Sequence, residues 1–131
     1  MWRAPFATAL FALLTLLLAP APAAAQRPLP AEPDTSVISP AMVDAGRVIF
    51  RGKGTCYVCH GIQLEGSPVA PTLKPHAWKD AKNGEFGAIF YVVTHGVAKT
   101  LMVAYPGGIT RAEAISVASY VWSVGNKKAR P

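Results

Sequence analysis

The chain has 131 residues, thirteen Lys and Arg, seven Asp and Glu, and a formal net charge of +6 at pH 7. A chain of this length builds one small core rather than two. The positive charge favours an acidic protein partner or an anionic membrane surface. It does not favour a nucleic-acid partner, because the chain begins with an export signal and its longest basic run is Lys127-Lys128.

Residues 1–25 predict a secretory signal peptide. Arg3 gives a positive start, the stretch from Phe6 to Ala19 is apolar apart from two threonines, and Ala23-Ala24-Ala25 supplies small residues at the cleavage site. The apolar stretch is shorter than the ~20 residues that cross a bilayer, so we expect cleavage after Ala25. The protein is therefore predicted to be periplasmic or otherwise exported, with membrane association as the alternative if the segment is kept.

Residues 26–39 predict an extended, flexible arm. The segment contains several prolines and few large apolar side chains. A sequence of this composition cannot bury enough surface to fold on its own. The folded domain is accordingly expected to span residues 40–131.

The domain begins with a predicted helix. Ser39 is a capping residue and Pro40 suits the first helical position. Apolar or small residues then share one face, and the helix should end near Gly52. The residues on this face are Val43, Gly46 and Phe50.

Two further helices are predicted downstream. One runs from about Glu85 to His95, with Gly96 as its stop signal. The other begins at Thr110, which forms a capping box with Glu113, and continues to about Val124. The stretches 61–84 and 96–109 read as irregular. Loops this long are uncommon in a small all-α domain unless something else, such as a buried cofactor, organises them.

The residues Cys56-Tyr57-Val58-Cys59-His60 form the attachment pattern of a c-type haem. Two thiols three residues apart reach the two vinyl groups at one porphyrin edge, and the next histidine is held where its imidazole meets the iron. A thiol–disulfide site is the competing interpretation, but such a pair usually opens a helix after a strand, and no such unit is predicted. Zinc would need further ligands, and the chain has only two cysteines.

From about residue 41 to 124 the chain resembles the class I cytochromes c. Gly46-Arg47-Val48-Ile49-Phe50 is similar to the G-x-x-x-[FY] pattern of that family's first helix, and Ser119-Tyr120-Val121 to the aromatic segment of its last. The resemblance implies a small cytochrome c fold, with three main helices and long loops wrapped around one covalent haem. It also implies that the first and last helices cross at Gly46, with Phe50 and Tyr120 at the crossing.

The resemblance implies that Met102 is the sixth ligand of the iron, opposite His60. Met102 follows His60 by 42 residues and precedes the capped last helix, where the family keeps its axial methionine. The sequence departs from the family at Val103, where many relatives have a proline that stiffens the loop. His95 is the rival ligand, although a role at the helix end is expected for it. His76 is a weaker rival, expected on an exposed loop.

Further haem contacts are implied by the same resemblance. The Pro71 carbonyl is expected to accept a hydrogen bond from His60, which fixes the orientation of the imidazole. Leu73 should pack on the haem. Trp78 and Tyr105 either donate hydrogen bonds to the propionates or lie in the core wall with their polar tips outward.

These residues predict a one-electron carrier rather than an enzyme. Histidine and thioether ligands fill both axial positions of the iron and raise its potential. The expected partners are a redox donor and acceptor, one of them membrane-bound or acidic at its docking surface, met by lysines such as Lys53, Lys79, Lys82 and Lys99. The protein would be a monomer or a subunit of an electron-transfer complex. Two alternatives stay open: a fixed subunit of a larger oxidoreductase, and a haem enzyme or gas sensor with an open sixth position.

Overall fold

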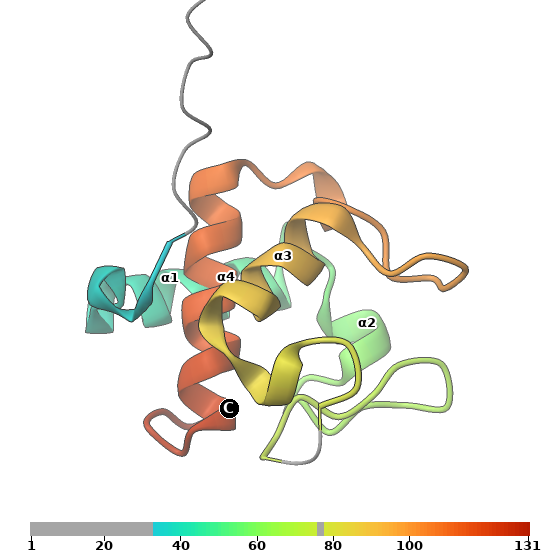
Figure 1. The fold of residues 1–131 in the computed structure, drawn as a ribbon, viewed down its shortest axis with the longest axis horizontal. Helices are drawn as coiled ribbons and strands as arrows, with labels where there is room; N and C mark the ends of the chain where they lie inside the picture. The colour runs from blue at the N-terminus through green and yellow to red at the C-terminus, as the bar shows by residue number, and fades with distance from the viewer. Residues whose placement is uncertain (1–32, 76–77) are drawn as a thin grey trace, which may run out of the picture.

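The computed structural model describes residues 33–75 and 78–131. Its helices are α1 (Pro40–Arg51), α2 (Tyr57–His60), α3 (Phe86–His95) and α4 (Arg111–Gly125) (Figure 1). Three 3-10 turns are also present, η1 (Thr35–Val37), η2 (Lys82–Gly84) and η3 (Pro106–Gly108). No β-strand occurs in these residues. The predicted all-α class is therefore confirmed, and α2 is an additional short helix within the Cys56–His60 motif.

The ends of the long helices are set by the capping residues that the sequence predicted. The Ser39 hydroxyl accepts a hydrogen bond from the Met42 amide at 3.2 Å, and Pro40 opens α1. Gly96 ends α3 with a φ of +72°, a conformation that glycine adopts without strain. The Ser39 hydroxyl and the Gly96 amide thus give hydrogen-bond partners to backbone groups at the helix ends that have none inside the helix.

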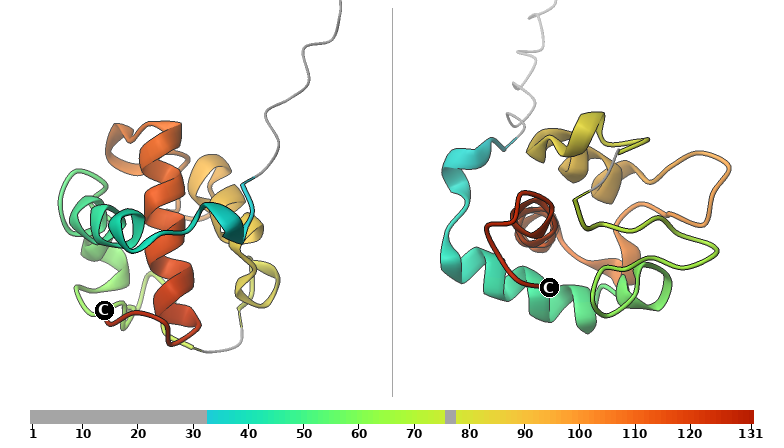
Figure 2. Two further views of the ribbon diagram at one scale, coloured as in Figure 1. Left: turned by 90° about the vertical axis from the view of Figure 1, so that its left-hand side faces the viewer. Right: turned by 90° about the horizontal axis from the view of Figure 1, so that it is seen from below.

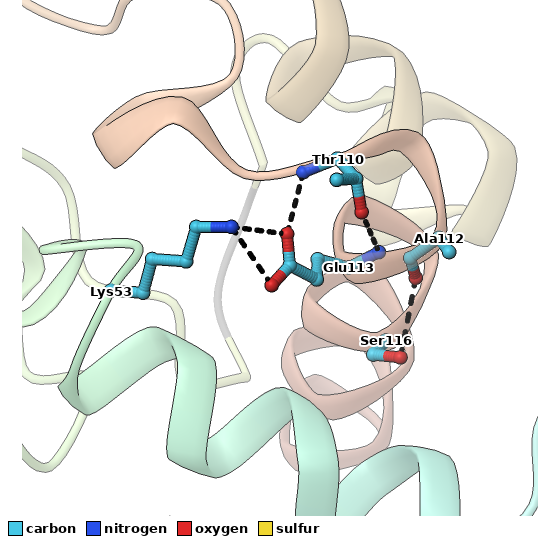
Figure 3. Close-up of polar contacts among 5 residues, drawn as sticks. All are labelled: Lys53, Thr110, Ala112, Glu113 and Ser116. Carbon is cyan, nitrogen blue, oxygen red and sulfur yellow. Dashed lines mark hydrogen bonds and ion pairs between the residues drawn. The ribbon is translucent and has the colours of Figure 1, made fainter.

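The N-terminus of α4 is fixed by a capping box and by a lysine from far upstream (Figure 3). The Glu113 carboxylate accepts a 2.7 Å hydrogen bond from the Thr110 amide, and the Thr110 hydroxyl accepts one of 3.2 Å from the Glu113 amide. The Lys53 ammonium lies 3.0 and 2.8 Å from the two Glu113 oxygens. The turn that follows α1 is thereby joined to the start of α4.

Helices α1 and α4 cross at Gly46. A Cβ atom at this position would overlap the Ser116 carbonyl oxygen and lie 2.8 Å from the Tyr120 Cβ. Beside the crossing, the Phe50 and Tyr120 rings meet edge to face, with centroids 5.6 Å apart. The predicted crossing residues are confirmed, because only a glycine lets the two backbones approach this closely.

The core lies on both sides of α4, which packs against α1 and α3 (Figures 1 and 2). Its interior is apolar and dominated by aromatic and β-branched side chains. The largest buried members are Phe50, Leu64, Phe86, Ile89, Phe90, Ile109 and Tyr120. Because α4 packs against both α1 and α3, it is the central helix of the fold.

The C-terminal part of the predicted arm lies against the domain. The predicted signal peptide and residues 26–32 fall outside the described residues. Residues 33–39 are not simply extended, because Asp34 caps the η1 turn and the partly buried Ile38 packs against the core. Within the described part of the chain, no helix is both long enough and apolar enough to cross a membrane.

Replacing Gly46 should destabilise the protein, whereas the same change at Gly87 should not. Gly46→Ala and Gly46→Val force α1 away from α4, and overpacking of this kind costs about 1–3 kcal/mol. Gly87 also lies in a helix, but a Cβ there meets nothing within 4 Å. Gly87→Ala should therefore raise the free energy of unfolding by about 0.5–1 kcal/mol. Denaturant unfolding of the three variants measures both effects, and equal stabilities would contradict the crossing.

The Glu113 contacts predict a specific pH dependence of stability. Hydrogen bonding to Lys53, then to the Thr110 amide, lowers the pKa of Glu113 to about 2 from its ordinary 4.5. A carboxylate with a depressed pKa stabilises the fold above its unfolded pKa, and this contribution is lost as the pH falls. Glu113→Gln should thus lower the melting temperature at pH 7, with the difference from the parent vanishing toward pH 2.

The control for this prediction is Asp44→Asn. Asp44 pairs with Arg47 at 2.7 Å on the exposed face of α1, and an exposed pair within one helix contributes little. The melting temperature of Asp44→Asn should stay close to that of the parent across the same pH range. A difference between Glu113→Gln and the parent that does not change with pH would count against the ionised contact.

Candidate functional site

The Cys56–His60 motif is placed by the end of α1. Helix α1 stops at Arg51, and a tight turn leads into Cys56, the residue that caps α2. Gly54 is buried in this turn, and a Cβ atom there would lie 2.9 Å from the Ile49 carbonyl oxygen and 3.1 Å from the Cys56 Sγ. The motif is therefore held against the last turn of α1.

The two cysteines are partly buried free thiols. Cys56 Sγ donates a 3.4 Å hydrogen bond to the Gly54 carbonyl, and burial raises the pKa of this thiol to about 11. Cys56 is therefore a neutral thiol at pH 7. A thiol–disulfide catalyst needs the opposite, a pKa lowered enough to form a thiolate, so this alternative loses support. In the described residues, no group of three or more His, Cys, Asp or Glu side chains is placed to hold a metal ion.

His60 is oriented for ligation through one ring nitrogen. Its Nδ1 lies 2.9 Å from the Pro71 carbonyl oxygen. Because a carbonyl can only accept, Nδ1 carries the proton and Nε2 keeps its lone pair. Burial lowers the pKa of His60, partly opposed by the hydrogen bond to Pro71, which favours the neutral imidazole that a metal binds. The structure thus forms the hydrogen bond expected between these two residues.

The loop that carries Pro71 is closed by its own hydrogen bonds. Leu64 is completely buried, and its carbonyl accepts from the Leu73 amide at 2.9 Å and from the Thr72 hydroxyl at 2.9 Å. The Gly66 amide donates to the His60 carbonyl at 2.7 Å. This network fixes the Pro71 carbonyl relative to the imidazole.

Met102 lies in the loop between α3 and η3. This loop, α2 and the 61–75 loop lie on the same side of the molecule, away from the N-terminal segment 33–38 (Figures 1 and 2). Met102 is partly buried, whereas the neighbouring side chains Leu101 and Val103 are 71% and 59% exposed. The methionine side chain is thus shielded within an otherwise exposed stretch.

The rival ligand His95 is engaged on the outer surface of α3. Its ring is stacked on Tyr91, with centroids 4.0 Å apart, and both side chains are exposed. Its Nδ1 lies 2.9 Å from the Thr94 hydroxyl and 3.1 Å from the Tyr91 carbonyl. These contacts hold the ring near the C-terminus of α3, where a role at the helix end was expected. His76 lies outside the described residues.

The remaining predicted contacts are partly buried and pack against the core; they are Leu73, Trp78 and Tyr105. The Trp78 ring lies against two glycines, because a Cβ on Gly84 would be 2.5 Å from its Nε1 and one on Gly125 would be 3.0 Å from its Cζ2. Their predicted contacts with haem stay predictions.

Together these residues suit a covalently bound porphyrin. The Cys56 and Cys59 thiols are three residues apart at the start of α2, and the imidazole of His60 keeps its Nε2 lone pair available. A sequence profile described as "Cytochrome c" matches residues 43–125. The chain belongs to the cytochrome c family. It therefore carries haem c, and Cys56 and Cys59 have the spacing of the covalent attachment motif.

Solved structures of similar fold are also c-type cytochromes or part of a larger assembly. Cytochrome cL of Methylophaga aminisulfidivorans MPT is 25% identical, with a TM-score of 0.53 over 62% of this chain and 53% of that one. Cytochrome cL of Hyphomicrobium denitrificans is 22% identical, with a TM-score of 0.52 over 61% and 45%. A chain of the Kuenenia stuttgartiensis reducing HAO-like protein complex is 21% identical, with a TM-score of 0.55 over 66% and 45%.

This cytochrome c aligns with only about half the length of each of those structures. The two matches below 25% identity support the fold alone. A comparison with curated protein sequences gave no match.

Two features of the site escaped the sequence analysis. Leu64 is an isolated apolar residue between Gln63 and Glu65, with no periodicity to mark it as buried. The role of Lys53 was also missed, because its partner Glu113 is 60 residues away. Lys53, expected among the docking lysines, is held by that carboxylate.

Covalent attachment can be tested through the two cysteines. After acid–acetone treatment, the parent and the single variants Cys56→Ala and Cys59→Ala should keep their haem, because one thioether bond is enough to retain it. The double variant should lose it. Mass spectrometry of the treated chains gives the result, and a Cys56–Cys59 disulfide without added haem in the parent would contradict the assignment.

Proposed function

We propose that this cytochrome c is a one-electron carrier whose iron is held by His60 and Met102. The observation that carries the proposal is the shielding of Met102 in a loop whose other side chains, from Ala98 to Ala104, are exposed. The thioether of Met102 has no polar group that requires a hydrogen-bond partner inside the protein, so hydrogen bonding does not explain why this side chain is partly buried. The loop between α3 and η3, which contains Met102, lies on the same side of the molecule as α2 (Figure 1), and this supports a role for Met102 as the second ligand beside His60.

The contacts of His95 support the same choice. The ring is stacked on the exposed Tyr91 and its Nδ1 faces the Thr94 hydroxyl and the Tyr91 carbonyl. Ligation by His95 would require breaking this stack.

In this mechanism, His60 and Met102 would hold the iron, and the chain would keep both side chains in place. The haem would supply the redox centre, and the soft methionine sulfur would raise the potential of its iron. His60 stays aligned because Nδ1 donates to Pro71, and that bond also increases the basicity of the ligating nitrogen. With both ligands retained, little rearrangement accompanies the gain or loss of one electron.

The partners are proposed to be a protein donor and a protein acceptor met in short encounters. Of the four lysines expected at the docking surface, Lys53 is paired with Glu113, whereas Lys79, Lys82 and Lys99 are exposed and could steer an acidic partner. The alternative is a fixed subunit of a larger oxidoreductase. The fold of a chain from the Kuenenia complex shows that such a domain also occurs inside an assembly.

The last part of the proposal is that the protein is exported. Residues 1–25 have the pattern of a cleaved signal peptide, which would place the haem domain in the periplasm or another exported compartment. If the segment is kept, the protein would instead be held at the membrane and act there as a tethered carrier. The electron-transfer role is the same in either case, and no substrate turnover is proposed.

Binding of carbon monoxide separates a carrier from an open-site enzyme or sensor. The ferrous parent should bind carbon monoxide slowly or not at all, because Met102 must leave the iron first. Met102→Ala should bind it readily, lose the weak charge-transfer band of iron–methionine ligation and have a lower potential. Stopped-flow mixing, ferric spectra and potentiometry measure the three effects.

His95→Ala is the matched control, since it removes the rival ligand and should leave all three readouts unchanged. If His95→Ala binds carbon monoxide readily and Met102→Ala does not, the sixth ligand has been misassigned. Rapid, complete binding by the parent, together with peroxide turnover, would favour the enzyme or sensor.

A further inference from the structure

The segment 97–102 closes on itself at the end of α3. The Val97 amide donates a 2.9 Å hydrogen bond to the Met102 carbonyl, so the two ends of the segment meet. Gly96 makes this approach possible, because a Cβ there would lie 2.5 Å from the Met102 carbonyl oxygen. At the tip, Lys99 adopts a φ of +62°, which tightens the turn. The backbone of the proposed ligand is therefore tied to Val97, the residue that follows the Gly96 cap of α3.

One side chain bridges the interior of this turn. The Thr100 hydroxyl donates a 2.8 Å hydrogen bond to the Val97 carbonyl and accepts one of 3.1 Å from the Met102 amide. A single hydroxyl thus connects the first residue of the segment to the amide of Met102.

The bridge lies next to the position at which the sequence departs from its family. Many relatives have a proline after the methionine, which stiffens the chain at that point, whereas this chain has Val103. Valine leaves φ free and restores an amide group, so the covalent restraint is absent. The remaining restraints are hydrogen bonds. Thr100 makes three of them, two through its hydroxyl and one from its amide to the Val97 carbonyl at 3.2 Å. The Val97 amide also donates to the Met102 carbonyl, and the Tyr105 amide donates to the Val93 carbonyl at 2.9 Å.

We propose that Thr100 is a positioning residue, whose hydroxyl holds Met102 on the iron in place of the missing proline. The inference rests on the proposed assignment of Met102 as a ligand. Met102 would leave the iron only if its loop moved, and the Thr100 hydroxyl would oppose that motion through its contacts with Val97 and Met102. Thr100 touches neither the iron nor a partner in this role; it acts entirely through the Met102 backbone.

The decisive comparison is between Thr100→Val and Thr100→Ser. Valine keeps the branched shape of threonine and removes the hydroxyl, whereas serine keeps the hydroxyl and removes the methyl group. The rate of carbon monoxide binding scales with the fraction of molecules in which Met102 has left the iron. One exposed hydrogen-bonding group contributes a modest free energy, so Thr100→Val should bind carbon monoxide roughly two- to tenfold faster than the parent.

Thr100→Ser should bind carbon monoxide at a rate close to that of the parent. The ferric iron–methionine band should weaken in Thr100→Val and be retained in Thr100→Ser. Thr100→Ala, which also lacks the hydroxyl, should agree with Thr100→Val. Because the position is exposed, all three holoproteins should have helical content similar to that of the parent, which far-UV circular dichroism checks.

Met102→Ala distinguishes the two ways in which the inference can fail. If Met102→Ala binds carbon monoxide readily and Thr100→Val matches the parent, the role of Thr100 is wrong while the ligand assignment stands. If Met102→Ala binds no faster than the parent, the ligand assignment is wrong and the role of Thr100 fails with it. Equal changes in Thr100→Val and Thr100→Ser would also overturn the proposal, since they would point to loop shape rather than the hydroxyl.

Discussion

The close approach of α1 and α4 is the constraint on which the rest of this cytochrome c depends. At Gly46 the two backbones meet without an intervening side chain, and the edge-to-face contact of Phe50 and Tyr120 fills the space beside them. Only a short turn separates the end of α1 from Cys56, so the same crossing sets the position of the haem attachment site. The pairing of Lys53 with Glu113 joins that turn to α4 from the other side.

The two long loops obtain their shape from hydrogen bonds within each loop. Between His60 and Leu73, the buried Leu64 accepts two hydrogen bonds and so fixes the segment that presents the Pro71 carbonyl. After α3, the Val97 amide reaches the Met102 carbonyl. A buried cofactor was expected to organise these loops, and each loop also has internal hydrogen bonds that restrain the backbone near one of the proposed ligands, His60 or Met102.

The sequence predicted the elements whose signals are local. Caps at Ser39 and Thr110 and the stop at Gly96 marked three helices to within one or two residues, because each signal is a backbone requirement met by a neighbouring side chain. Helix α2 was missed, since four residues are too few to show a periodic apolar face. The haem motif was evident for the same reason as the caps, its spacing being short and fixed.

What the sequence could not predict involves contacts over long separations. The Lys53–Glu113 pair joins residues 60 positions apart, and no pattern in either segment marks it. The burial of Leu64 depends on which surface its loop meets after folding. The hydrogen bond from His60 to Pro71 was predicted because the resemblance to a family contained it, and not because the residues alone imposed it.

The order in which the crossing helices occur along the chain has a consequence for maturation. A polypeptide emerges N-terminus first, so α1 and the two thiols appear well before α4, the last helix. During that interval α1 lacks the surface on which it packs, and the turn before Cys56 lacks its anchor at Glu113. The cysteines are then accessible on a loose chain, which suits covalent attachment of a large cofactor. Arrival of the C-terminal helix closes the domain, so the topology itself provides a time window for haem insertion.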